Sequence, residues 1–268
     1  MTSTEPARQQ CAVTVLGGPT AVIDIGGLRL VTDPTFDEPG PHGYLTKTSG
    51  PAVPESALGS VDAVLISHDQ HPDNLDDRGR AFAQDAPVVL TGPLSAARLA
   101  GRAVGLPPWT SHRLPRRDGG GDLTILAVPA VHGPEDGARD AQGNVNCEVT
   151  GFVLSGSGLP TVYISGDNAS IRTVAEVSRR VPGISAAVLH AGAARVPAKF
   201  DGRPLSMDGS RTAAAAAVLG AEIVIPAHYD GWTHFSEGLT DVESAFHEAG
   251  LSSVLRTAPH GSWVTLLP

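Results

Sequence analysis

The sequence predicts one α/β domain, with β-sheets in the middle and helices on the outside. Three observations lead to this fold class. Short apolar strands joined by glycine pairs open the chain, strand-like and helix-like segments alternate from residue 61 onward, and no Pro/Gly/Ser-rich linker separates two compositions. We therefore expect a single domain over residues 11–268, preceded by a polar tail over residues 1–10.

The first part of the chain predicts a run of hairpins. Gly17-Gly18 and Gly26-Gly27 each separate two short, mainly apolar runs, which is the usual signal for a tight turn between antiparallel strands. Residues 36–60 contain several Pro and Gly without periodicity, so we expect a long loop there. The strands expected in this part cover residues 12–16, 21–25 and 28–32.

Beyond residue 61, apolar runs suited to buried strands alternate with amphipathic segments suited to helices. In the segment 171–181, for example, Ile171, Val174 and Val177 share one side of a helix. The expected strands are 61–67, 87–91, 123–128, 148–154, 161–165, 186–189, 222–226 and 263–267. The expected helices are 74–84, 94–103, 171–181, 210–219 and 242–249.

Composition narrows the class of function. The chain has 268 residues, of which 41% are hydrophobic, and its 19 basic and 28 acidic residues give a net charge of −9. This balance argues against nucleic acid or an anionic membrane as partner, because both attract clusters of Lys and Arg. No apolar run approaches the ~18 residues of a membrane-spanning helix, and the first ten residues lack the apolar core of a signal peptide. The two cysteines are too few for a disulfide framework or a thiolate metal cluster. We therefore expect a cytoplasmic protein that acts on a small molecule, with its oligomeric state left open.

Histidine and aspartate side chains follow several of the expected strands. The carboxyl ends of strands in a layered α/β fold meet at one edge, where binding sites are built. Taken singly, each of these residues could be an ordinary loop residue, and Asp167 could cap a helix. Such groups at four separate strand ends favour one shared site instead. They are His68 and His71 after strand 61–67, His132 after 123–128, Asp167 after 161–165 and His228 after 222–226.

Imidazole and carboxylate groups together are the ligands that Zn, Mn and Fe take in proteins. Several of them can hold two metals ~3.5–4 Å apart, and a bound water then loses its proton near pH ~7. That chemistry suits the hydrolysis of esters, lactones, amides or phosphodiesters. A serine hydrolase is disfavoured, because the sequence has no Gly-x-Ser-x-Gly motif.

The ordered set of motifs resembles the metallo-β-lactamase superfamily, whose first motif reads His-x-His-x-Asp-His. The branch it resembles includes the ascorbate-6-phosphate lactonase-like proteins. The resemblance implies a four-layer αβ/βα sandwich with a metal site on the edge that the two sheets share. The segments that carry it are 31–34, 67–76, 130–134, 165–168 and 226–229.

The resemblance also implies roles for individual residues. Asp167 would bridge two metals, and Asp73 and His228 would belong to the second metal. Asp33 matches an aspartate that supports the metal loop in this family. The residues that carry over as metal ligands are His71, Asp73, His132, Asp167 and His228.

The first motif departs from the family pattern at two places. It is one residue longer when counted from His68, so either His68 ligates from a bulged loop or Asp69 ligates; we favour His68. Asn74 stands where the family has its last histidine, and asparagine is a poor zinc ligand. We therefore expect one or two bound divalent ions, Zn or Mn, with fewer than two bound tightly.

The sequence thus predicts a metal-dependent hydrolase that uses a metal-activated hydroxide on a small ester, lactone or phosphate-containing metabolite. Asp73 and His190 are the expected catalytic residues, and His190 has a plain structural role as its alternative. His234 is expected to shape the pocket, and Cys147 is expected to be a buried strand residue. The competing hypothesis is a non-catalytic binding module on the same fold, with a metal site damaged at Asn74.

Overall fold

The structure is a computed structural model that describes residues 6–267. Residues 1–5 of the expected N-terminal tail lie outside the described range. The helices are α1 (Asp77–Asp85), α2 (Pro93–Leu99), α3 (Ile171–Arg180), α4 (Gly209–Leu219) and α5 (Leu239–Glu248), with short 3-10 turns at Glu55–Ala57 and Phe200–Gly202.

The strands form two large sheets and one small hairpin. The seven-stranded sheet has the order β15-β1-β2-β3-β6-β7-β8, the six-stranded sheet has the order β14-β13-β12-β11-β10-β9, and β4 pairs with β5. The strands of the first sheet are β1 (Cys11–Gly17), β2 (Thr20–Ile25), β3 (Leu28–Thr32), β6 (Ala63–Leu65), β7 (Val89–Thr91), β8 (Ala103–Gly105) and β15 (Val264–Thr265). The strands of the second sheet are β9 (Ser111–Pro115), β10 (Asp122–Pro129), β11 (Thr150–Ser155), β12 (Thr161–Ile164), β13 (Ile184–His190) and β14 (Ile223–Ala227), and the hairpin consists of β4 (Gly40–His42) and β5 (Leu45–Lys47).

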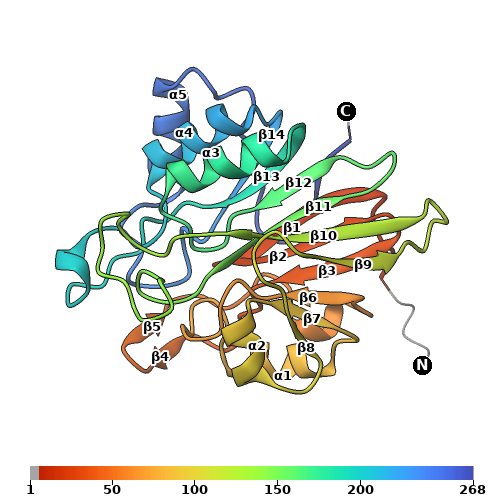
Figure 1. Ribbon diagram of the computed structural model, residues 1–268, viewed down its shortest axis with the longest axis horizontal. Coiled ribbons are helices and arrows are strands. Elements are labelled where there is room, and N and C mark those ends of the chain that lie inside the picture. The colour runs from red at the N-terminus through yellow and green to blue at the C-terminus, as the bar shows by residue number, and fades with distance from the viewer. Residues whose placement is uncertain (1–5, 268) are drawn as a thin grey trace.

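The two sheets pack face to face and helices cover their outer faces (Figure 1). Side chains such as Ile23 on β2 and Phe152 on β11 fill the space between the sheets. A second apolar cluster, with Phe246, joins the six-stranded sheet to α3, α4 and α5, and a third, with Ala83, lies on the α1 side of the seven-stranded sheet. The result is the four-layer αβ/βα sandwich that the family resemblance implies, with the sheets inside and the helices outside as the residue pattern predicts.

Several boundaries differ from the expected ones. The expected loop 36–60 contains the β4–β5 hairpin, and strands β8 and β9 were not expected. The expected helix 94–103 stops at Leu99, because Ala100 adopts a positive φ of 54° and the chain turns into β8. The expected strand 148–154 begins at Thr150, because Glu148 instead accepts hydrogen bonds from the first turn of α2.

Strand direction brings many loops to one edge of the sandwich. In the first sheet β3 runs parallel to β6 and β7, and in the second sheet β12, β13 and β14 are parallel. Strand β10 has the same direction as β12, because each is antiparallel to β11. The loops that leave β3, β6, β10, β12 and β14, together with the last residue of β13, carry the polar residues of the site.

Asp76 fixes the start of α1 beside this edge. Its side chain accepts hydrogen bonds from the backbone nitrogen of Gly79 at 2.8 Å, as an N-cap, and from that of Phe36 at 3.0 Å. Lys47 donates to the same buried carboxylate at 2.9 Å. One side chain therefore ties the helix to the β3–β4 loop and to β5. Within residues 6–267, no helix is long and apolar enough to cross a lipid bilayer.

Candidate metal centre

The loop after β6 is held in place by the loop after β3. Asp33, at a positive φ of 39°, accepts a hydrogen bond at 2.6 Å on Oδ1 from the backbone nitrogen of Ser67. The backbone nitrogen of Thr150 donates to the Ser67 carbonyl at 2.9 Å. These bonds set the direction in which His68 leaves the strand. Burial raises the pKa of Asp33 to about 8.

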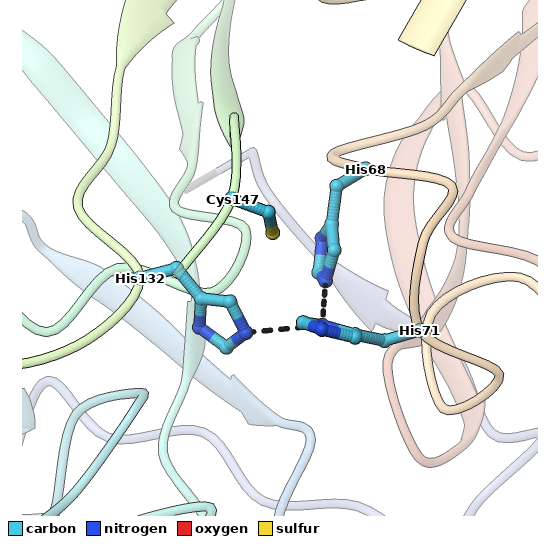
Figure 2. A group of neighbouring side chains, drawn as sticks. All are labelled: His68, His71, His132 and Cys147. Atoms are coloured by element: carbon cyan, nitrogen blue, oxygen red, sulfur yellow. Dashed lines mark hydrogen bonds between the residues drawn. The ribbon is translucent and has the colours of Figure 1, made fainter. Parts of the chain in front are cut away.

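His68, His71, His132 and Cys147 form what we call the histidine cluster. His68 Nε2 lies 2.8 Å from His71 Nδ1, and His132 Nε2 lies 3.1 Å from the same atom. One potential ligand atom from each of the four residues falls within 4.8 Å of all the others, and all four residues are buried. Figure 2 shows the three rings turned toward one another, with the Cys147 sulfur facing the space that they enclose.

The protonation of these imidazoles suits metal binding. His132 Nδ1 lies 2.8 Å from the carbonyl oxygen of Leu205, which can only accept, so the proton of His132 is on Nδ1 and a lone pair on Nε2 faces the cluster. Burial lowers the pKa of His71 to about 3 and that of His68 well below its ordinary value. The rings are therefore neutral near pH ~7.

Asp73, Asp167, His190, His228 and His234 form the second group, which we call the acidic cluster. His190 Nδ1 lies 2.8 Å from Asp167 Oδ1, and His228 Nε2 lies 3.4 Å from the same oxygen. His228 and His234 both approach Asp73 Oδ2, at 3.1 and 2.9 Å. The rings of His190 and His228 stack with their centroids 4.8 Å apart.

Opposite charges stabilise each other in the acidic cluster. Burial by itself raises the pKa of Asp167, but His228 and His190 outweigh it and hold that pKa well below its ordinary value. Asp73 behaves in the same way through His234 and His228. Burial by itself lowers the pKa of His228, but the two carboxylates outweigh it and raise that pKa. The carboxylates are therefore ionised at neutral pH.

Backbone contacts place the two clusters side by side. The Asn168 side chain accepts from the backbone nitrogen of Val131 at 2.9 Å, which joins the loop of His132 to the loop of Asp167. His132 Nδ1 and Asp167 Oδ2 are 3.7 Å apart, so Asp167 lies between the clusters. His228 has a positive φ of 58°, and its carbonyl passes so close to Gly192 that a Cβ there would lie 2.2 Å from that oxygen.

All the residues that the sequence predicts as metal ligands lie in the two clusters at the shared edge of the sheets. His68 is in the histidine cluster, whereas the Asp69 carboxylate pairs with the Arg98 guanidinium on α2 at 3.0 Å. Asn74, which replaces the last histidine of the family motif, lies beside the acidic cluster, and its side chain donates to Asp167 Oδ1 at 3.3 Å. His190 also lies at this edge, where its ring is grouped with Asp167 and His228.

Cys147 corrects two statements made from the sequence. It is not in a strand but in the loop before β11, and a thiol therefore stands beside the imidazoles where none was expected. Burial raises the pKa of its thiol. The direction of the strands could have predicted this position of Cys147. Because β10 and β11 are antiparallel, the start of β11 lies at the same edge of the sheet as the end of β10.

Comparisons with known proteins show the family and the fold to which this site belongs. Residues 28–229 match the model of the family described as "Beta-lactamase superfamily domain". The chain belongs to the metallo-β-lactamase superfamily. A UPF0173 metal-dependent hydrolase of Methanosphaerula palustris is 30% identical to it over 181 residues, which cover 64% of this chain and 69% of that protein.

Two further similar proteins extend the comparison. An uncharacterized protein of Mycobacterium tuberculosis is 35% identical over 137 residues, which cover 45% of this chain and 34% of that longer relative. Among solved structures, the isothiocyanate hydrolase from Delia radicum gut bacteria has a TM-score of 0.78 at 21% identity, over 95% of this chain and 98% of that one. The likeness to the solved structure concerns the fold.

Proposed function

We propose that this chain is a metal-dependent hydrolase whose centre takes divalent cations in the histidine cluster and the acidic cluster. The observation that carries the proposal is the convergence of buried neutral imidazoles and buried carboxylates on one edge of the sandwich. His71 Nδ1 has imidazole nitrogens of both His68 and His132 within 3.1 Å, and a nitrogen with one proton or one lone pair cannot pair well with both. Membership of the superfamily supports the same proposal.

Buried polar atoms without hydrogen-bond partners test whether these residues suit a divalent cation. Asp167 Oδ2, His190 Nε2 and His228 Nδ1 have no hydrogen-bond partner in the described part of the chain, although the three side chains are at most 1% exposed. Leaving such atoms unpaired costs roughly 1–3 kcal/mol each. Carboxylate oxygens and imidazole nitrogens are the ligand atoms of zinc and manganese, so these residues fit the metals that the superfamily implies.

The proposed ligand set follows the clusters. His68, His71 and His132 hold one cation, and Asp73 and His228 belong to a second, with Asp167 between the two. His190 supplies the acidic cluster with the imidazole that Asn74 does not provide. When bound, such cations polarise a carbonyl or phosphoryl oxygen and lower the pKa of water to about 7.

The chain's own residues orient the reaction. Asp73 is a carboxylate at neutral pH, and through Oδ2 it accepts hydrogen bonds that fix the His228 and His234 rings. We assign it the further role of orienting the attacking water. We assign His190 a place beside the reacting atoms, where its contact with Asp167 holds the ring in one orientation.

The neighbouring surface suits a small substrate that carries an anionic or polar group. A cavity of about 630 Å³ adjoins the acidic cluster and is lined by Tyr44, Arg195, His234 and Phe235, among others. The Lys199 ammonium lies 3.4 Å from His71 Nε2 and donates to Asn146 Oδ1 at 2.8 Å. These features favour a small ester, lactone or phosphate-containing metabolite. The net charge of −9 argues against a nucleic-acid substrate, and we place the reaction in the cytoplasm as part of the proposal.

The experiment is metal analysis by mass spectrometry on protein purified without chelator or nickel resin, followed by hydrolysis assays with the metal that is found. We expect zinc or manganese and turnover of at least one lactone, ester or phosphodiester. Isothiocyanates belong in the same screen, because a structural relative is named for their hydrolysis. Protein that takes up no metal after incubation with each cation would instead favour the binding-module hypothesis.

A further inference from the structure

The thiol of Cys147 is placed as a ligand would be. The side chain is 5% exposed and lies on the loop between β10 and β11, with its sulfur facing the three imidazoles (Figure 2). The described residues offer this thiol no hydrogen bond. The other cysteine, Cys11, lies in β1 within the core between the sheets and has no histidine cluster beside it in the described part of the chain.

The residues on either side hold Cys147 in this position. Asn146 has a positive φ of 64°, and its side chain accepts a hydrogen bond from Lys199. Glu148 accepts hydrogen bonds from the backbone nitrogens of Leu94 at 2.8 Å and Ser95 at 3.2 Å. Because neighbours on both sides are bound to other elements, the backbone at Cys147 cannot move away from the imidazoles without breaking these contacts.

We propose that Cys147 is the fourth protein ligand of the cation in the histidine cluster. This inference rests on the proposed function, which places a cation in the histidine cluster. It adds the Cys147 thiolate to the ligands of that cation. Zinc takes imidazole at ~2.0–2.1 Å and thiolate at ~2.3 Å, so tetrahedral ligand atoms lie about 3.4–3.6 Å apart. The four groups lie within 4.8 Å of one another, so the widest pair needs to approach by about 1.2–1.4 Å. The nitrogens of His68 and His132, at 2.8 and 3.1 Å from His71 Nδ1, need to move away from it by about 0.3–0.6 Å.

The proposal has three chemical consequences. As the sulfur–metal bond forms, the thiol proton passes to solvent, so the cation gains one negative ligand. Thiolate is a soft ligand that selects zinc over manganese, so the histidine cluster takes zinc, and the harder acidic cluster accepts either metal. Four protein ligands also close the first position, which leaves the acidic cluster as the place where water and substrate enter.

The test is titration of the metal-free full-length protein with Co²⁺, followed by absorption spectroscopy. Visible ligand-field bands report that the cation is bound, and an intense near-ultraviolet charge-transfer band reports sulfur ligation. We expect both in the wild type and in the matched variant Cys11→Ser, and we expect Cys147→Ser to lose the near-ultraviolet band while keeping the visible ones.

The outcomes separate the two proposals. Visible bands without the near-ultraviolet band in the wild type, or a near-ultraviolet band that survives in Cys147→Ser, would overturn the role of Cys147 and leave the metal centre standing. A protein that shows neither band would overturn both. If Cys147→Ser does not fold, X-ray absorption of the zinc-loaded wild type decides: a sulfur at ~2.3 Å supports the ligand, and a shell of nitrogen and oxygen alone contradicts it.

Discussion

The two clusters lie side by side yet are built from different chemistry. The histidine cluster combines imidazoles whose pKa values are lowered by burial with a thiol, and its residues come from the loops after β6 and β10 and before β11. The acidic cluster combines two carboxylates with three imidazoles, and the carboxylates raise the pKa of His228. The acidic cluster therefore carries buried negative charge, whereas the histidine cluster consists of uncharged groups in the metal-free chain. We infer from the ligand types that the histidine cluster binds a softer cation and the acidic cluster a harder one.

The largest expected effect comes from removing a histidine that only the first cluster uses. His132→Ala takes away a lone pair that the Leu205 carbonyl orients, so we expect loss of metal from this cluster and a fall in kcat of at least about 100-fold. Metal analysis and a hydrolysis assay measure it. His112→Ala on β9 is the matched control and should retain both. Full metal and full turnover in His132→Ala would show that the centre is assigned to the wrong residues.

Comparing variants of His68 and Asp69 decides which of these two neighbouring residues is the first metal ligand of the family motif. His68→Ala should lose the metal of the histidine cluster, because the ring is fully buried against His71. Asp69→Ala should keep the metal and lose only the ion pair with Arg98, which is worth at most about 1 kcal/mol at a partly exposed site. Metal content and urea unfolding separate these effects. Loss of metal in Asp69→Ala alone would reverse the assignment.

His190 tests whether the acidic cluster compensates for Asn74. The sequence by itself predicts fewer than two tightly bound metals, whereas the structure brings a further imidazole to Asp167. We expect His190→Ala to weaken the second metal by ~10–100-fold while the histidine cluster stays filled. Calorimetric titration with zinc and with manganese measures both sites, and His247→Ala on α5 is the control. Equal affinities in His190→Ala and the wild type would leave His190 a structural role.

Most strands along the chain, and most of the side chains that gather at the shared edge, could be predicted from the sequence, because strand ends in an α/β fold converge and the motifs follow the strands. His68, His71, His132, Asp167 and His228 were placed at one edge in this way, and their role as metal ligands stays a prediction. Cys147 was not placed there, because it precedes its strand, and only the antiparallel pairing of β10 and β11 brings the start of β11 to the same edge. The sequence also could not decide between His68 and Asp69 as the residue that faces the cluster. The Asp69 carboxylate is turned away by its ion pair with Arg98, which lies 29 residues away in the sequence.

The smallest expected effect concerns a histidine–aspartate pair outside both clusters. His260 Nε2 donates to Asp230 Oδ2, and this hydrogen bond raises the pKa of His260 despite partial burial, which lowers it. A raised folded-state pKa stabilises the fold below the unfolded value of about 6.5, and this contribution disappears as the pH rises through the folded value. The urea midpoint of the wild type should therefore exceed that of His260→Gln at about pH 6, and the gap should narrow by about pH 9. Because the pair needs no cation, chelator should leave the gap unchanged, in contrast to any variant of the two clusters. A gap that widens with pH would contradict the raised pKa of His260, and a gap that vanishes with chelator would mean that His260 acts through the metal centre.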